Sequence, residues 1–216
     1  MVRGVLFDMD GLMFDTERLD LEAWEHAGRE LGFPTDRQTL LFVRGMADAD
    51  LANYLREAFG PKFDPVRSRQ ARLAYSNAWI QAHGMPVKPG LYVLLKELKK
   101  RGIPAALATS TSRSTAMGYL EKAGVKDDFA ASVCGREVER TKPAPDVFQK
   151  AASLLGLEPS ECMVLEDSPH GIAAACAAGC IPVMVPDLSQ PDEELRAQCA
   201  AVVSSLEQVI ALLDQF

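Results

Sequence analysis

Two pairs of acidic residues stand directly after short apolar runs that are typical of buried strands. Asp8 and Asp10 follow residues 2–7, and Glu166 and Asp167 follow residues 162–165. Carboxylates brought together repel one another unless a cation lies among them. Oxygen ligands suit a hard cation, and Mg²⁺ is the usual one for phosphate substrates. The four acids therefore predict a magnesium site.

Hydroxyl groups and a lysine follow two other predicted strands. Thr109 and Ser110 come after the apolar residues 103–108, and Lys142 lies in the loop after residues 129–133. Hydroxyl and ammonium donors stabilise the negative oxygens of a phosphoryl group during its transfer. These three residues favour phosphate as the bound group.

The spacing of Asp8 and Asp10 suits a two-step phosphoryl transfer. Residues two apart in an extended chain point the same way, so both carboxylates can reach one substrate. One can attack phosphorus and form an aspartyl-phosphate while the other handles the proton of the leaving group. The predicted chemistry is phosphoryl transfer through a carboxylate nucleophile.

An alternation of strands and helices places these residues together. Helical spacing is predicted at residues 91–101, 114–123, 146–155 and 169–178, with a last helix from 206. Strands are predicted at residues 2–7, 103–108, 129–133, 162–165, 181–185 and 201–203. This order predicts an α/β fold, a Rossmann-like parallel sheet covered on both faces, with ligands at the carboxyl ends of its strands.

Residues 15–87 differ from the rest because they predict helices and no convincing strand. A helical block of this length is too long for a simple crossover between two strands, so it should form a module of its own. We predict a catalytic core at residues 1–14 and 88–216 and an inserted small α-helical cap domain at residues 15–87.

The combined motifs resemble those of a known superfamily. Asp8-Met9-Asp10-Gly11, Thr109, Lys142 and Glu166-Asp167 resemble, in order and spacing, the four motifs of the haloacid dehalogenase superfamily. The runs Phe7–Leu12, Asp15-Thr16-Glu17, Lys142–Asp146 and Leu165–Ser168 are similar to its β-phosphoglucomutase-like phosphatases, and the resemblance covers nearly the whole chain. It implies a magnesium-dependent phosphatase that hydrolyses a small phosphorylated metabolite, such as a sugar or polyol phosphate.

The resemblance also implies roles for the acids. Asp8 would be nucleophile and metal ligand. Asp10 would be the general acid and base, with its backbone carbonyl on Mg²⁺. Asp167, with Glu166 beside it, would complete the metal site.

Phosphate and substrate contacts are implied in the same way. Thr109 and the backbone of Ser110 would hold the phosphate, and Lys142 would neutralise it, although Thr141 replaces the family's glycine before this lysine. The resemblance places Arg44 and Gly45 in a cap loop that faces the site, so we expect them to contact substrate. Asp20, in the first cap helix, is a further candidate for such a contact.

Three other functions are weighed against the phosphatase. A mutase of the same family carries a histidine where this chain has Asp20, which favours hydrolysis. A haloacid dehalogenase does not need the second aspartate, which Asp10 supplies. A non-enzymatic phospho-acceptor domain phosphorylates an aspartate after a later strand and lacks a helical insertion, so Asp8 argues against it.

Composition limits the partners. The net charge of -7, from 30 acids and 23 bases, argues against nucleic acid or an anionic membrane surface as the main partner. No secretory signal is recognised, since Asp8 interrupts the first apolar run. The odd number of cysteines, five, favours reduced thiols in a cytoplasmic protein. We expect a monomer that binds a small phosphorylated metabolite.

Overall fold

The computed structural model describes residues 1–42, 48–60 and 63–216. The chain divides into two compact units, Met1–Asp15 with Met85–Phe216, and Thr16–Gly84. The first is the catalytic unit and the second the helical unit. The role of the helical unit as a cap stays a prediction.

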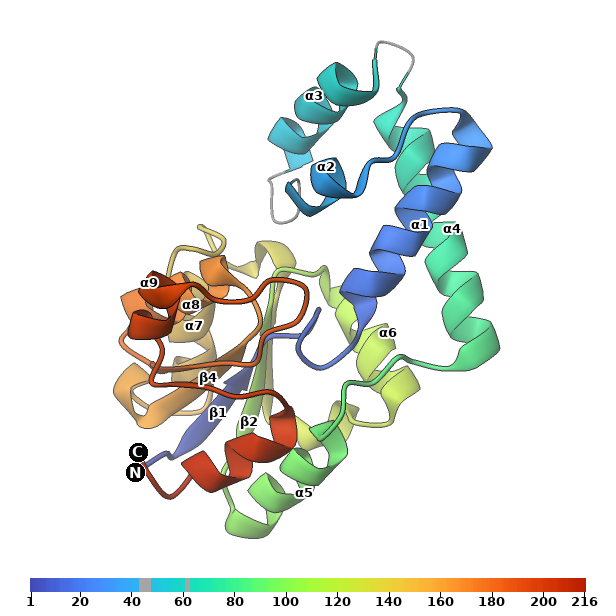
Figure 1. Cartoon of the computed structure of the whole chain (residues 1–216). Helices are drawn as coiled ribbons and strands as arrows, with labels where there is room; N and C mark the ends of the chain where they lie inside the picture. Colours follow the sequence, from blue (N-terminus) through green and yellow to red (C-terminus); the bar gives the residue numbers. More distant parts are fainter. Residues whose placement is uncertain (43–47, 61–62) are drawn as a thin grey trace. The chain divides into compact units, whose positions relative to one another are not determined.

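The catalytic unit is built on a six-stranded parallel sheet (Figure 1). The strand order is β3-β2-β1-β4-β5-β6, so the first strand of the chain lies in the middle of the sheet. The strands are β1 (Gly4–Phe7), β2 (Ala105–Thr109), β3 (Ala131–Cys134), β4 (Cys162–Glu166), β5 (Ile181–Met184) and β6 (Ala201–Val202). The predicted α/β fold with a Rossmann-like parallel sheet is confirmed.

Helices cover both faces of this sheet. Alternate residues of β1 point to opposite faces. Val5 and Phe7 belong to one apolar cluster, with residues of α5 (Leu91–Arg101), α6 (Arg113–Ala123) and the 3-10 helix η4 (Leu206–Leu212). Leu6 belongs to the other cluster, with residues of α7 (Asp146–Leu154) and α8 (Pro169–Ala178). The terminal helix that the sequence predicts from residue 206 is present as the 3-10 helix η4.

Short elements complete the unit. They are α9 (Glu193–Gln198) and the 3-10 turns η1 (Lys126–Asp128), η2 (Gly135–Glu137) and η3 (Pro159–Glu161). The two segments that lead to the helical unit pair with each other, because Asp15 N donates to Pro86 O at 2.7 Å and Lys88 N donates to Met13 O at 2.9 Å. The buried carboxylate of Asp187 accepts a hydrogen bond from Lys88 Nζ at 2.7 Å. These bonds fix the joins on the catalytic side.

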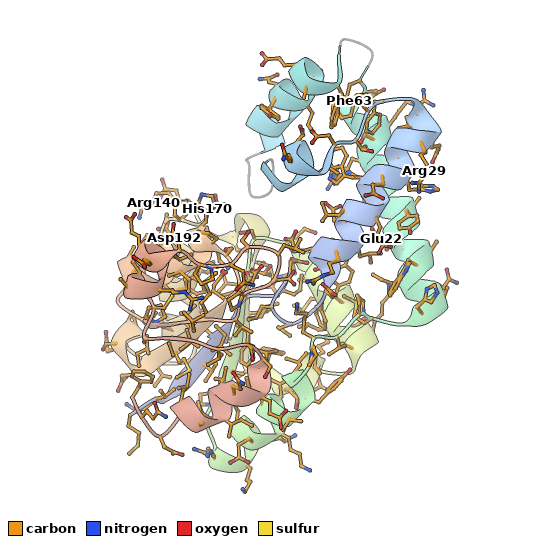
Figure 2. All side chains as sticks on the ribbon, viewed as in Figure 1. Glu22, Arg29, Phe63, Arg140, His170 and Asp192 are labelled. Atoms are coloured by element: carbon orange, nitrogen blue, oxygen red, sulfur yellow. The ribbon has the colours of Figure 1, made fainter. Side chains whose placement is uncertain are left out.

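The helical unit has an aromatic core of its own. Its helices are α1 (Thr16–Leu31), α2 (Arg37–Phe42), α3 (Asp48–Phe59) and α4 (Pro65–His83). Phe63, labelled in Figure 2, has its ring centroid 5.0 Å from that of Phe33 and 5.3 Å from that of Phe59. The guanidinium of Arg72 lies 3.8 Å from the centre of the Trp24 ring, a cation–π contact. Among the described residues, no helix is long and apolar enough to cross a membrane.

Candidate active site

The predicted site residues of the catalytic unit meet where the central strands end. β1 pairs in parallel with β2 on one side and with β4 on the other. Asp8, the residue after β1, donates its backbone N–H to Leu165 O at 3.0 Å. Thr109 ends β2 and Glu166 ends β4. Parallel strands end at the same edge, so these side chains gather there.

Lys142 links two of the carboxylates. Its Nζ donates to Asp8 Oδ1 at 2.5 Å and to Glu166 Oε1 at 2.6 Å, and its side chain is 9% exposed. The ammonium also lies 4.8 Å from the centre of the Phe148 ring in α7. These hydrogen bonds are charge-assisted and shielded from water, so they hold the lysine firmly at the edge of the sheet.

The carboxylate of Glu166 accepts four hydrogen bonds. Besides Lys142, its Oε2 accepts hydrogen bonds from Asp167 N at 3.0 Å, Ser168 N at 3.0 Å and Ser168 Oγ at 2.9 Å. Three of these four donors lie on Oε2 and one, Lys142, lies on Oε1, so the group is well hydrogen-bonded within the protein. A Cβ on Gly171 in α8 would lie 1.8 Å from Glu166 Cδ, so the glycine makes room for this carboxylate.

Negative charge dominates the buried part of the site. Asp8, Glu166 and Asp167 are buried and each has an oxygen within 4.8 Å of the others. The pKa of Asp8 is raised to about 8, chiefly by burial. Lys142 acts to lower this pKa, whereas the negative charges of Glu166 and Asp10 raise it further. Burial lowers the pKa of Lys142, but the charges of Asp8 and Glu166 outweigh it and the pKa is raised. This all-oxygen, negatively charged set fits a hard divalent cation.

Hydroxyl groups approach the second aspartate from the loop after β2. Asp10 is partly exposed, and its Oδ2 accepts a hydrogen bond of 2.6 Å from Thr111 Oγ1. Thr109 is 2% exposed, and its Oγ1 accepts a hydrogen bond of 3.1 Å from Thr111 N. Ser110 is exposed between them. Sequence reasoning missed Thr111, although the hydroxyl-rich run of residues 109–112 was a signal for it.

Comparison with known proteins identifies the family of this chain. The model of the haloacid dehalogenase-like hydrolase family matches residues 5–185. The chain belongs to the haloacid dehalogenase-like hydrolases. It is 33% identical over 214 residues to hexitol phosphatase A of Escherichia coli (strain K12), covering 96% of this chain and 93% of that protein. It is 35% identical over 213 residues to a probable pseudouridine-5'-phosphatase of Drosophila melanogaster, covering 95% and 90%.

Solved structures of the family share the fold. The crystal structure of a putative β-phosphoglucomutase from Thermotoga maritima matches with a TM-score of 0.81 at 27% identity, covering 100% of this chain and 99% of that chain. Together with the relatives named as phosphatases, these matches confirm the sequence prediction of a phosphatase of the haloacid dehalogenase superfamily with a β-phosphoglucomutase-like fold.

The remaining site predictions of this hydrolase fall in three places. Asp20 lies in the helical unit, where its carboxylate accepts a hydrogen bond from Arg72 Nη1 at 3.0 Å. Arg44 and Gly45 lie outside the described residues. Thr141, which replaces the family glycine, has no positive φ, and its carbonyl accepts a hydrogen bond from Ala144 N. The loop before Lys142 therefore needs no glycine.

His170, which the sequence places beside the acidic pair, is the second residue of α8. It is exposed at the surface and is labelled in Figure 2. Asp167, three residues earlier, is buried in the acid cluster. The structure thus separates the buried acids from a solvent-facing histidine that follows them closely in sequence.

Proposed function

We propose that this protein is a magnesium-dependent phosphatase that hydrolyses a small sugar or polyol phosphate through an aspartyl-phosphate on Asp8. The observation that carries the proposal is the Asp8 carboxylate, buried at the end of the central strand and bonded to Lys142 beside two further acids. The relatives named for hexitol and pseudouridine phosphates support a small phosphorylated substrate.

Asp8, Asp167 and the backbone carbonyl of Asp10 would hold the Mg²⁺. Glu166 lies in the same cluster, but its carboxylate already accepts a hydrogen bond from Lys142 on Oε1 and three more on Oε2. We therefore assign Glu166 the support of Lys142. When bound, Mg²⁺ would neutralise charge on the phosphoryl oxygens and favour the ionised form of Asp8.

Asp8 acts as the nucleophile in the first half-reaction. One of its carboxylate oxygens forms a bond to phosphorus while the ester P–O bond breaks, and the electron pair leaves with the substrate oxygen. Lys142 balances the charge of the phosphoryl oxygens. The Thr109 hydroxyl already accepts from Thr111 N, so its own hydrogen can be donated to the phosphate, together with the backbone N–H of Ser110.

Asp10 carries the protons of both half-reactions. It gives a proton to the departing substrate oxygen and then takes one from the water that attacks the aspartyl-phosphate. That attack releases inorganic phosphate and regenerates Asp8. After the two steps Asp10 has recovered its proton, so the cycle balances with one water consumed.

Substrate choice would rest with the helical unit. We propose that Asp20, Arg44 and Gly45 contact the part of the substrate that does not react. Arg72 donates hydrogen bonds to the Asp20 carboxylate and so holds both side chains in fixed directions. This pairing is compatible with recognition of hydroxyl groups of the substrate.

A β-phosphoglucomutase activity is the second candidate, favoured by the likeness to the structure of a putative β-phosphoglucomutase. A mutase must keep water from its aspartyl-phosphate until the sugar phosphate returns. An ionised Asp20 cannot donate the hydrogen bond that a histidine gives in the resembling mutases. The phospho-enzyme should therefore be short-lived, which favours hydrolysis.

The test measures phosphate release from a panel of hexitol phosphates, sugar phosphates and nucleoside monophosphates, with Mg²⁺ and with excess EDTA. We expect hydrolysis of several sugar or polyol phosphates that EDTA abolishes and added Mg²⁺ restores. The Asp8→Asn variant should lose at least about 1,000-fold in rate, since the attacking oxygen is gone. Undiminished turnover in EDTA would refute the metal mechanism. Rapid conversion of β-glucose 1-phosphate to glucose 6-phosphate with little free phosphate would instead identify a mutase.

A further inference from the structure

The hydroxyl of Thr111 contacts the carboxylate of Asp10 across two separate loops. Thr111 Oγ1 donates to Asp10 Oδ2 at 2.6 Å, between residues 101 positions apart in the chain. A bond from a hydroxyl to a carboxylate at this length is charge-assisted and stronger than a neutral one. The phosphate-binding roles assigned above to Thr109 and Ser110 do not account for this contact.

The backbone around Thr111 is held in place from both sides. On one side, Thr111 N donates to the buried hydroxyl of Thr109 at 3.1 Å. On the other, Gly135 has a φ of +49°, and a Cβ there would lie 3.3 Å from Thr111 O and from Ser112 Cα. Glycine at this position therefore lets the turn after β3 close onto the loop that carries Thr111.

Arg113 anchors the end of the same loop. Its guanidinium donates to Glu137 through Nε, to Glu137 Oε2 through Nη2 at 2.8 Å, and to the backbone carbonyl of Ser132 at 2.9 Å. Glu137 also accepts a hydrogen bond from Cys134 N at 3.1 Å. The loop after β2 is thus tied to β3 and to the turn η2, which limits how far the backbone of Thr111 can move.

The orientation of the Asp10 carboxyl decides whether it can transfer a proton. Asp8 is buried and accepts a hydrogen bond from Lys142, whereas Asp10 is partly exposed and accepts one from Thr111. A proton donor is effective only when it lies within hydrogen-bond reach of the leaving oxygen. A hydrogen bond from a fixed partner to Oδ2 selects one orientation of the Asp10 side chain. It thereby also fixes the position of the other oxygen, Oδ1.

We propose that Thr111 is a positioning residue that orients Asp10 for proton transfer to the leaving group, an inference that rests on the proposed function. Asp10 Oδ2 can accept the hydrogen bond of the Thr111 hydroxyl both when the carboxyl is ionised and when its proton lies on Oδ1, the oxygen turned to the leaving group. The contact therefore persists through both half-reactions: Asp10 first gives its proton to the oxygen whose bond to phosphorus breaks, and then regains one from the water that attacks the aspartyl-phosphate.

The test separates proton donation from phosphate binding by the choice of leaving group. Thr111→Val keeps the shape but removes the hydroxyl. For a hexitol phosphate, whose alkoxide needs a proton, kcat/KM should fall on the order of 30-fold with KM little changed. For p-nitrophenyl phosphate, whose phenolate leaves without a proton, kcat/KM should fall much less, by about 3-fold or under. Thr111→Ser should restore most of the rate on the hexitol phosphate.

A double-mutant cycle completes the experiment. In the Asp10→Asn background, adding Thr111→Val should change kcat/KM for the hexitol phosphate by less than about 2-fold, because the effect passes through Asp10. Equal losses on both substrates, or a raised inhibition constant for inorganic phosphate, would overturn the proposal and make Thr111 a phosphate ligand. If Thr111→Val does not fold, Thr111→Ala takes its place. A Thr111→Ser variant that is as slow as the variant without a hydroxyl would also overturn the proposal. A wild-type protein that hydrolyses neither ester refutes the proposed function instead.

Discussion

At the scale of the residue, the site is governed by the cost of burying like charges. Asp8, Glu166 and Asp167 are packed within 4.8 Å of one another, and Lys142 bonds two of them. Glu166 is satisfied by four donors, so its charge is stabilised within the protein. Asp8 has Lys142 as its cationic partner, yet its pKa is raised to about 8. Ionising Asp8 in the folded protein therefore costs free energy.

Asp8→Asn should therefore stabilise the metal-free protein while it abolishes turnover. Between the unfolded pKa of 3.8 and the folded pKa of about 8, the folded protein binds a proton at Asp8 that the unfolded chain has lost. Wild-type stability then falls as pH rises through this window, by at most about 1.4 kcal/mol per pH unit. Asparagine does not ionise, so position 8 contributes no such pH dependence in the variant.

Thermal unfolding in EDTA at pH 5 and at pH 8 measures this effect. The Tm of Asp8→Asn minus that of the wild type should be larger at pH 8. A difference that stays the same at the two pH values would mean that Asp8 is ionised throughout, held so by Lys142. Asp192→Asn, at the exposed start of α9, serves as a control for loss of one negative charge outside the site.

At the scale of the element, the first turn of α8 is shaped around a side chain from the strand before it. Ser168 caps this helix, because its Oγ accepts from Gly171 N at 3.1 Å while donating to Glu166 Oε2. Gly171 leaves the space that the Glu166 carboxylate fills. Strand, cap and helix thus hold one carboxylate, which in turn holds Lys142.

Gly171→Ala should disrupt this arrangement. The new Cβ would lie 1.8 Å from Glu166 Cδ, and the carboxylate could move only by giving up its hydrogen bonds. We expect a loss of about 2 to 4 kcal/mol in unfolding free energy and a fall in kcat as Lys142 is displaced. Chemical denaturation and steady-state kinetics measure the two effects.

Gly118→Ala is the matched control for this substitution. Gly118 lies inside α6, and a Cβ there would have nothing within 4 Å. Alanine should add about 0.5 to 1 kcal/mol of stability at this position by its helix preference. If Gly171→Ala were also neutral or stabilising, Glu166 would have to be far less constrained than its hydrogen bonds indicate.

At the scale of the whole molecule, the sequence predicted the layout of the sheet better than the contacts within the site. The apolar runs ending in Asp8, Thr109 and Glu166 sufficed to place those residues at one edge, because parallel strands leave few alternatives. The bond from Thr111 to Asp10 joins residues 101 apart and depends on side-chain rotamers, which periodicity does not encode. The need for glycine at position 171 is equally invisible, since it arises from a carboxylate on another element.

The division into two units leads to the last prediction, which concerns how Mg²⁺ stabilises the chain. The proposed ligands, Asp8 and Asp167, belong to the catalytic unit, whereas both tryptophans, Trp24 and Trp79, belong to the helical unit. Binding at 100 times Kd adds about 2.7 kcal/mol to the unit that binds, or about 5 to 10 °C in Tm. Because the helical unit has an aromatic core of its own, we expect Mg²⁺ to raise the main calorimetric transition and to leave the tryptophan-fluorescence midpoint within about 2 °C. Asp167→Asn should remove most of the calorimetric shift, which ties it to the site. Equal shifts by both probes would show instead that the two units unfold as one, and no shift by either would count against Mg²⁺ at these carboxylates.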